Sequence, residues 1–432
     1  MNIVLLSGGS GQRLWPLSNS VRSKQFIKLF KNPDGQYESM VQRVYRQIIA
    51  ANPQADITIA TSHAQVSAIR GQLGSRVSVC VEPCRRDTFP AIALAAAFLH
   101  YEKGKSKDDV VIVSPVDPYA DDSFFQTLCS LDDIVRRSRV HLTLVGISPS
   151  YPSEKYGYIF PAAEAPVSPV QAFREKPDAA AAAEYLRQNA LWNAGIFAFK
   201  LGYLLEKSHA LLEYTDYQNL LQKYDSLPQI SFDYAVVEKE TSIQVVRFAG
   251  EWKDIGTWNT ITDVMSEPLK GRVTADSACQ NLHVINELEL PMLCVGCRNL
   301  VVAASADGIL VADRDGSARI KPYVERLHTD PHFKERSWGT YTVIDVQRTS
   351  LTVKIHLQAG RQMTYHAHER RREIWNILSG SGYVMLDGVR KEVRPGDVVQ
   401  IPISCRHTLQ ADTDMDAIEI QLGEDIDVRD KF

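Results

Sequence analysis

The sequence predicts an α/β domain with a mostly parallel sheet, followed by a β-rich segment and an all-β barrel. Over residues 1–262, short apolar runs alternate with stretches of helical periodicity, the order of strands joined by crossover helices. Residues 263–328 hold short β-type runs separated by glycines and charges, which indicate a small solenoid or β-rich connector. From residue 335 to 432, strands alternate with glycine turns, as in a small barrel or jelly roll.

Five apolar runs in the first domain have the length of buried strands. They cover residues 3–6, 57–61, 77–81, 110–113 and 142–147. Between the first two, apolar residues from Met40 to Ile49 recur at helical spacing, and Pro90 starts an alanine-rich helix where proline is tolerated. This order predicts a sheet covered on both faces, with a ligand at the carboxyl ends of its strands.

The first candidate site follows the first strand, in LSGGSGQRLWPLS at residues 6–18. Gly8, Gly9 and Gly11 let the backbone turn tightly and point amide groups at phosphate oxygens or a base edge. Arg13 and Lys24 are near enough in sequence to supply cations to the same site. The alternative is a glycine-rich turn with solvated charges, since short glycine patterns often match by chance.

Composition excludes several function classes. With 432 residues, 44% hydrophobic and 23% charged, the chain has the composition of a soluble globular protein with more than one core. A net charge of −4 gives no broad attraction for nucleic acid or anionic membrane, so we expect neither as a partner. No apolar stretch reaches the roughly 18 residues of a membrane helix and no signal peptide is visible, so we expect a cytoplasmic protein.

The connector holds several strand-like runs and part of the cysteine complement. The runs cover residues 282–286, 292–297, 300–305, 308–313 and 318–324. Cys294 and Cys297 form a C-x-x-C without a second pair, so we interpret them as packed reduced thiols, with zinc or redox use as the alternative. The polar segment 327–337 contains one proline and predicts a linker before the barrel.

Eight motifs in order give the chain a family resemblance. They are SKQF (23–26), EPCRRDTFPAIALAA (82–96), PVD (115–117), EKYGYI (154–159), FREKP (173–177), WNAGIFAF (192–199), FDYAVVEK (232–239) and WKDIGTW (252–258). With the glycine segment and RSWGTY (336–341), they resemble the sugar-1-phosphate nucleotidylyltransferases, above all the long mannose-1-phosphate guanylyltransferases that continue into a phosphomannose-isomerase-like cupin domain. The resemblance implies a Rossmann-like nucleotidyltransferase domain, a β-helix-like connector and a C-terminal cupin.

The reaction implied is nucleotidyl transfer from a nucleoside triphosphate, with GTP favoured, to a sugar 1-phosphate, most simply giving GDP-mannose and pyrophosphate. No protein nucleophile is needed, so catalysis depends on positioning two polyanions and neutralising charge. One alternative is a bifunctional enzyme that also interconverts mannose 6-phosphate and fructose 6-phosphate. Another is a non-catalytic nucleotide-sugar-binding regulator. Unpaired strand edges further suggest a homo-oligomer, a dimer or higher.

By the same resemblance, the motif residues take three roles. The triphosphate and the leaving pyrophosphate would be bound by Gly8, Gly9, Gly11, Arg13 and Lys24. Mg²⁺ would be held by Asp117 and Asp254, since hard carboxylate oxygens suit this ion, although both could be ordinary turn residues. The sugar phosphate would be contacted by Gly157, Glu175, Lys176, Asn193 and Gly195.

Some residues depart from the family pattern or read as structural. Gln12 and Ser23 replace a threonine and a proline, and the usual P-A-D-H reads PVDP at residues 115–118. These changes lie near the nucleotide or metal, where they could alter base choice without removing charged groups. We interpret Asp233 as a helix cap, and we interpret the tryptophans of these motifs, Trp192, Trp252 and Trp258, as core anchors.

A second constellation lies in the cupin segment. The spacing of His366, His368, Glu373 and His407 matches the two-part cupin motif, because H-x-H presents two imidazoles on one face of a strand. The four side chains would hold a divalent ion such as Zn²⁺, Mn²⁺ or Fe²⁺. Where the isomerase signature has a histidine after the glutamate, this chain has Ile374, which puts isomerase activity in doubt. The arginine run 370–372 is interpreted as a solvated turn, with binding of a sugar phosphate near the metal as the alternative.

Overall fold

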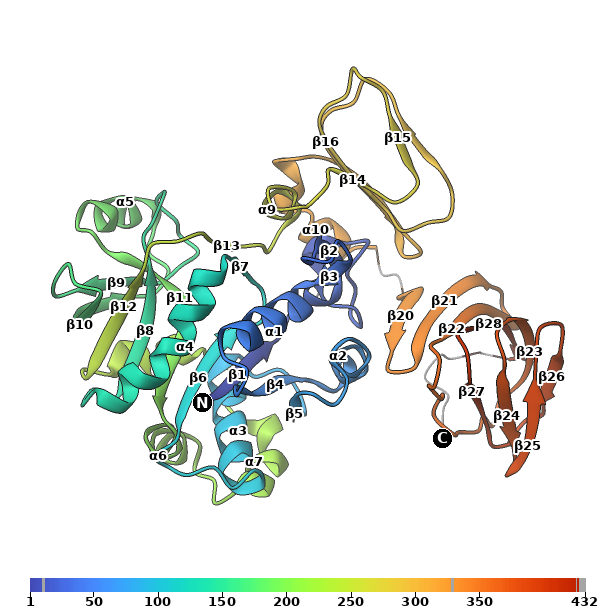
Figure 1. Ribbon diagram of the computed structural model, residues 1–432, viewed down its shortest axis with the longest axis horizontal. Coiled ribbons are helices and arrows are strands. Elements are labelled where there is room, and N and C mark those ends of the chain that lie inside the picture. The colour runs from blue at the N-terminus through green and yellow to red at the C-terminus, as the bar shows by residue number, and fades with distance from the viewer. Residues whose placement is uncertain (10–11, 328–329, 425, 427–432) are drawn as a thin grey trace. The chain divides into compact units, whose positions relative to one another are not determined.

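The computed structural model describes residues 1–9, 12–327, 330–424 and 426. Contacts divide the chain into two compact units (Figure 1), each described by itself. The first unit comprises residues 1–9, 28–66 and 75–255, and the second comprises residues 10–27, 67–74 and 256–432. The predicted division into three domains, 1–262, 263–328 and 335–432, is a finer one than these two units and stays a prediction.

A nine-stranded sheet forms the centre of the first unit. In spatial order its strands are β5 (Ser78–Glu82), β4 (Asp56–Ser62), β1 (Asn2–Ser7), β6 (Val110–Pro115), β11 (Leu191–Lys200), β8 (Leu142–Ile147), β12 (Ile243–Phe248), β10 (Val167–Arg174) and β9 (Tyr158–Pro161). The five predicted strands are confirmed as β1, β4, β5, β6 and β8. The predicted α/β class is also confirmed.

The sheet is less parallel than the sequence pattern predicts. Strands β5, β4, β1 and β6 run parallel, as do β8 and β12. Strand β11 runs antiparallel to both β6 and β8, and β9 and β10 pair as an antiparallel hairpin. An apolar run reads the same in either direction, so only the pairing decides that the sheet is mixed.

Helices cover both faces of this sheet. Helix α4 (Asp122–Arg137) packs on β6, β8 and β11, and α1 (Met40–Ala51) lies against it. Helix α3 (Thr88–Ala97) packs on β1, β4 and β5, and contacts α6 (Leu201–Leu212), α7 (Tyr217–Gln222) and α8 (Phe232–Ala235). Helix α3 begins two residues before Pro90, because the Asp87 side chain accepts a hydrogen bond from the Thr88 amide at 2.7 Å.

The second unit contains a small solenoid. Parallel strands stack in two ladders, β14 (Leu269–Lys270), β16 (Gln280–Asn286) and β18 (Arg298–Ser305) in one, and β15 (Val273–Ala275) and β17 (Met292–Cys294) in the other. Strand β19 (Gly308–Asp313) closes the first ladder antiparallel to β18. The predicted strand at 318–324 is wrong: a 3₁₀ turn and α10 (Lys321–Val324) form instead, with Pro322 in the first helical turn, where its missing N–H costs nothing.

The C-terminal barrel consists of two sheets. The larger contains β20 (Phe333–Arg336), β21 (Gly339–Val346), β22 (Ser350–Leu357), β28 (Met415–Gly423), β23 (Arg371–Ser379) and β26 (Val398–Ile401). The smaller contains β25 (Val389–Val393), β24 (Gly382–Leu386) and β27 (His407–Ala411). The predicted linker is wrong over residues 333–336, which pair with β21; residues 328–329 lie outside the described part.

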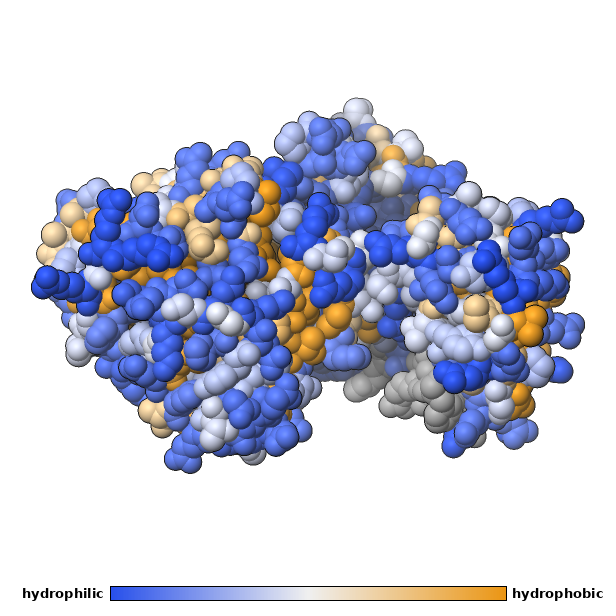
Figure 2. All heavy atoms as spheres, turned by 60° about the horizontal axis from the view of Figure 1, so that its bottom comes forward, coloured by the Kyte–Doolittle hydropathy of each residue, from blue (hydrophilic) through white to orange (hydrophobic). Residues whose placement is uncertain are grey.

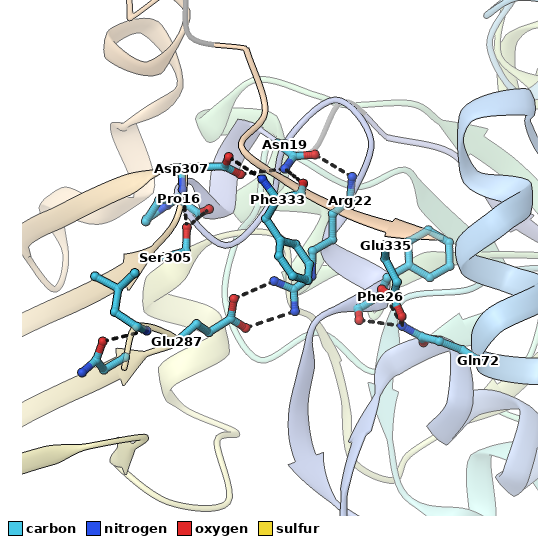
Figure 3. Close-up of polar contacts among 12 residues, drawn as sticks. Pro16, Asn19, Arg22, Phe26, Gln72, Glu287, Ser305, Asp307, Phe333 and Glu335 are labelled. Carbon is cyan, nitrogen blue, oxygen red and sulfur yellow. Dashed lines mark hydrogen bonds and ion pairs between the residues drawn. The ribbon is translucent and has the colours of Figure 1, made fainter. Parts of the chain in front are cut away.

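Residues that follow the glycine segment are fixed within the second unit (Figure 3). Arg22 donates from Nη1 and Nη2 to the Glu287 carboxylate at 2.7 and 3.0 Å. Asn19 Nδ2 donates to Asp307 Oδ2 at 2.7 Å, and Ser305 Oγ donates to the Pro16 carbonyl at 2.7 Å. The segment 12–27 is therefore held by the solenoid through side chains distant in sequence.

Hydrophilic residues cover most of the face shown in Figure 2, and apolar residues reach it in patches. Among the described residues, none of the helices combines the length and the hydropathy that crossing a bilayer requires.

Candidate active site

A cavity of about 430 Å³ lies at the carboxyl ends of the parallel strands in the first unit. Ser7, Gly8 and Gly9 line it where β1 ends, and Asp117 lines it just after β6. Gly9 has a φ of +135°, a conformation that favours glycine. The structure therefore brings two of the three predicted glycines and one predicted carboxylate to one cavity. Gly11 lies outside the described residues.

Two arginines that the sequence analysis did not predict as site residues complete this cavity. Arg85 and Arg86 lie between β5 and α3 and line the cavity. Arg85 Nη2 donates to the Gly9 carbonyl at 2.5 Å, which fixes the glycine turn. The signal was present in EPCRRDTFPAIALAA, where two consecutive arginines precede a helix start. Guanidinium groups beside glycine amides suit a phosphate-bearing ligand.

The two predicted metal-binding aspartates come from segments that are joined by strand pairing. Strand β7 (Pro118–Ala120) pairs antiparallel with β13 (Trp252–Asp254), and Asp254 lies opposite Pro118. Because Asp117 directly precedes Pro118, the register brings the backbones of the two aspartates close together. Asp117 is half-buried and Asp254 is exposed. Of the two, Asp117 lines the cavity. Carboxylate oxygens are the donors that Mg²⁺ prefers.

All five residues predicted to contact a sugar phosphate are close together. The Asn193 amide donates to the Gly157 carbonyl at 2.8 Å, and the Lys176 ammonium lies 3.1 Å from Glu175 Oε1. A Cβ on Gly157 would lie 2.5 Å from Glu175 Oε2, so a larger residue there would displace a neighbouring side chain. The amide of Gly195 donates to Asn193 Oδ1 at 3.1 Å. Position 195 also borders the first cavity, because a Cβ there would lie 3.9 Å from the lining residue Pro115.

Asp233 belongs to this cluster, and its interpretation as a helix cap is wrong. The N-cap of α8 is Ser231, whose side chain accepts from the Tyr234 amide. Asp233 Oδ1 instead accepts from Asn193 Nδ2 at 2.8 Å. Burial and the nearby Glu175 carboxylate raise the pKa of Asp233 to about 7. This carboxyl therefore changes between its protonated and ionised forms near neutral pH.

An aromatic group stands beside Asp254. The Tyr156 ring contacts the rings of Trp192 and Trp252, at 4.9 and 5.7 Å between centroids. Burial and the Asp254 charge raise the pKa of Tyr156, which keeps its hydroxyl protonated. Trp192 is 4% exposed and Trp258 is fully buried, so both are core anchors as predicted, whereas Trp252 is half-buried.

The two remaining predicted cations lie in the second unit. Arg13 is exposed on a 3₁₀ turn at Gln12–Leu14, and Lys24 is half-buried on another at Lys24–Phe26. The latter turn places Lys24 two residues after Arg22, whose ion pair with Glu287 anchors the segment.

Three histidines converge inside the C-terminal barrel. One ring nitrogen from each of His366, His368 and His407 lies within 4.8 Å of the others, and all three side chains are buried. His366 Nδ1 lies 2.6 Å from the Thr364 carbonyl, and His407 Nδ1 lies 2.9 Å from the Cys405 carbonyl. These bonds assign the proton to Nδ1 and turn Nε2 toward the cluster, as metal-binding histidines require.

Glu373 joins the histidines and is held by further donors. Its Oε1 lies 2.9 Å from His368 Nε2 and accepts from Arg371 Nε at 3.0 Å, and its Oε2 accepts from Trp375 Nε1 at 3.2 Å. Burial would raise the pKa of Glu373, but hydrogen bonds from His368 and His407 hold it well below its ordinary value. The solvated-turn interpretation is wrong for Arg371, which is 2% exposed, whereas Arg370 and Arg372 are exposed.

Comparison with known proteins accounts for both units. A family model described as nucleotidyl transferase matches residues 2–271, and one described as cupin domain matches residues 353–420. The xanthan biosynthesis protein XanB of Xanthomonas campestris pv. campestris (strain B100) is 30% identical, with 99% of this chain and 97% of that protein covered.

Two further similarities concern proteins named for mannose 1-phosphate. A mannose-1-phosphate guanylyltransferase of Klebsiella pneumoniae is 28% identical over 99% of this chain and 98% of its own length. A solved structure from Thermus thermophilus, described as a mannose-1-phosphate geranyltransferase, has a TM-score of 0.62 and 27% identity. The match covers 76% of this chain and 99% of that one.

Proposed function

The chain belongs to the nucleotidyl transferase family, and from this we propose that it transfers a guanylyl group from GTP to mannose 1-phosphate, with release of GDP-mannose and pyrophosphate. Relatives that match it nearly end to end include a mannose-1-phosphate guanylyltransferase, an alginate biosynthesis protein and xanthan biosynthesis proteins. Their names support these substrates and a role in polysaccharide supply. The chain is thus an enzyme rather than a nucleotide-sugar sensor.

One observation carries the proposal: the β7–β13 pairing brings the backbone of Asp254 close to that of Asp117, which lines a cavity together with glycines and arginines. A phosphate oxygen of the sugar phosphate attacks the α-phosphorus of the nucleotide in line, and pyrophosphate leaves. Asp117 and Asp254 would hold Mg²⁺, which when bound neutralises phosphate charge. Gly8, Gly9 and Arg85 position the phosphates on the cavity wall.

The remaining predicted residues have roles around the two substrates. Lys176 neutralises the sugar phosphate, and Asn193 and Glu175 fix sugar hydroxyls within the pocket that Gly157 keeps open. Arg13, Lys24 and Gly11 act on the triphosphate and the leaving pyrophosphate. We propose that the residues that differ from the family pattern, Gln12, Ser23 and PVDP at 115–118, determine which nucleotide base is preferred.

In the barrel, His366, His368, His407 and Glu373 form a donor set that fits a divalent ion such as Zn²⁺, Mn²⁺ or Fe²⁺. Arg371 and Trp375 donate hydrogen bonds to the Glu373 carboxylate and so fix its orientation. We do not extend the proposal to sugar isomerisation, because Ile374 follows the glutamate where a histidine would stand. We propose a cytoplasmic location, where these phosphorylated substrates occur, and a homo-oligomer.

The test is pyrophosphate release by the full chain with Mg²⁺, four nucleoside triphosphates and a panel of sugar 1-phosphates. We expect the highest kcat/KM with GTP and mannose 1-phosphate. Asp254→Asn should lower kcat on the order of a hundredfold, the cost of one lost electrostatic contact to a transition state. Glu251→Gln, at an exposed carboxylate of the same loop, should change little. No turnover by folded protein with any pair would contradict the proposal.

A further inference from the structure

The turn between β18 and β19, which we call the solenoid turn (residues 305–308), contacts the N-terminal segment 12–27. Ser305 ends β18 and Gly308 begins β19, so Asp307 lies in the turn itself. The segment belongs to the same compact unit as this turn, although β1, which precedes it in the chain, belongs to the other unit. The position of the segment therefore depends on contacts within the second unit.

The solenoid turn binds the first half of the segment, directly after the 3₁₀ turn that carries Arg13. Ser305 Oγ donates to the Pro16 carbonyl at 2.7 Å (Figure 3). The Trp15 ring packs on Gly308, because a Cβ there would lie 2.5 Å from Trp15 Cζ2 and would displace the ring. Two contacts with one turn therefore fix the backbone that follows Arg13.

Asp307 binds the second half of the segment through Asn19. Asn19 Nδ2 donates to Asp307 Oδ2 at 2.7 Å (Figure 3). Asn19 Oδ1 in turn accepts from the amides of Val21 and Arg22, at 2.8 and 2.6 Å, which closes a local turn. This turn ends at Arg22, two residues before Lys24. The Asp307 carboxylate therefore holds the side chain that sets the course of the backbone toward Lys24.

The other oxygen of Asp307 is bound by the backbone that enters the barrel. Asp307 Oδ1 accepts from the amides of His332 and Phe333, the latter at 3.2 Å. The Phe333 carbonyl also accepts from Asn19 Nδ2 at 3.0 Å. Anchoring the barrel entry requires only Oδ1, so the bond to Oδ2 serves the N-terminal segment. Bonds on both oxygens hold the carboxylate in one orientation.

We propose that Asp307 and Asn19 are positioning residues for Arg13 and Lys24 in nucleotidyl transfer. The inference rests on the proposed roles of these two cations toward the triphosphate and the leaving pyrophosphate. Cations that are held in place before the reaction need no reorganisation when charge develops on the phosphates. Loosening the segment therefore weakens the use of the nucleotide. The sugar phosphate is not affected, because its proposed ligands belong to the first unit.

The test is Asp307→Asn in the full chain. The new amide oxygen still accepts from the backbone at residues 332–333, but its NH₂ group faces the Asn19 NH₂ group, and two donors form no hydrogen bond. We expect faster hydrogen exchange over residues 12–27 by mass spectrometry. KM for GTP should rise, with kcat/KM for GTP falling about tenfold, and KM for mannose 1-phosphate should stay unchanged.

A second substitution tests the contact itself. Adding Asn19→Asp to Asp307→Asn exchanges donor and acceptor, so the amide at position 307 can donate to the carboxylate at position 19. We expect this double variant to recover part of kcat/KM for GTP; recovery is partial because the bond to the Phe333 carbonyl is lost. The control is Asp313→Asn on β19, which loses a similar 2.7 Å bond from Asn299 Nδ2 and should change neither exchange nor kinetics.

Three results would overturn the positioning role. They are unchanged exchange and kinetics in Asp307→Asn, a lower kcat with both KM values unchanged, and no recovery in the double variant. The last two would assign Asp307 a purely structural role. All three require a wild-type enzyme that turns over. They are therefore distinct from the absence of wild-type turnover, which would contradict the proposed function itself.

Discussion

At the scale of single residues, tertiary contacts change the meaning of a side chain. Asp233 sits in the first turn of α8, a position that reads as a cap, yet Ser231 caps the helix and Asp233 accepts from Asn193. Arg371 sits in a run of arginines that reads as solvated, yet it is buried against Glu373. Both side chains lie beside proposed ligand sites, where buried charge has to be paired.

Asp233 predicts a pH dependence of substrate binding. Its pKa is raised to about 7, so the carboxyl is protonated below neutrality and gains a negative charge as the pH rises through 7. That charge opposes an anionic sugar phosphate, and KM for mannose 1-phosphate should rise about fivefold from pH 6 to 8, or about 1 kcal/mol. Asp233→Asn should flatten this profile. An equal rise of KM in the variant would assign the effect to another group.

At the scale of elements, strand pairing brings the site residues together. The register of β7 and β13 sets Asp254 next to Asp117, and the Asn193 amide of β11 bonds the Gly157 carbonyl just before β9. These contacts join residues far apart in sequence. Their geometry follows from pairings that no local pattern specifies.

Gly157→Ala should impair the sugar-phosphate pocket while leaving the sheet intact. The added methyl would lie 2.5 Å from Glu175 Oε2 and 2.7 Å from the Phe173 ring, so one of them has to move. We expect KM for the sugar phosphate to rise about tenfold, or about 1.4 kcal/mol, with the KM for GTP little changed. Gly316→Ala is the control, because its Cβ meets neighbours at an ordinary 3.5 Å. Steady-state kinetics with each substrate varied gives both constants.

The anchor of the N-terminal segment predicts a stability effect. Burial lowers the pKa of the Arg22 guanidinium, but the Glu287 carboxylate outweighs this effect and raises it. The guanidinium carbon also lies 4.8 Å from the centroid of the Phe333 ring. Glu287→Gln leaves that charge buried without its partner. We expect a loss of about 2 kcal/mol, below the full cost of a wholly buried pair because Glu287 is partly exposed. Urea denaturation measures the free energy of unfolding. The control is Glu184→Gln, which removes the exposed ion pair with Arg187 and should change stability by less than about 0.5 kcal/mol.

At the scale of the whole molecule, each compact unit has its own core and its own ligand-binding residues. The first unit has a mixed sheet covered by helices, with its cavity at the carboxyl ends of the parallel strands. The second contains the solenoid and a barrel with buried histidines. Metal binding in the barrel should therefore stabilise the protein without acting on nucleotidyl transfer.

This separation is testable with Mn²⁺, one of the ions that the barrel donor set fits. At a hundred times its Kd, Mn²⁺ should stabilise the wild-type barrel by about 2.7 kcal/mol, seen as a higher thermal midpoint. His407→Gln should abolish that shift and leave pyrophosphate release with Mg²⁺ within about twofold, as for independent sites. A large loss of turnover in this variant would show that the sites are coupled.

The sequence by itself determined the class of fold, the five principal strands of the first unit and the identity of the barrel. Apolar periodicity is a local property, and eight ordered motifs are specific enough to indicate a family. The motif spacing also predicted the convergence of His366 and His368. The reason expected from strand geometry was wrong, because both lie between β22 and β23, where His366 forms an isolated bridge with His407.

Only the tertiary structure decided the direction of β11, the helix at 321–324, and the contacts of Asp233 and Arg371. Each of these features depends on strand pairing or burial between segments that are distant in sequence. A short stretch of sequence therefore does not determine them.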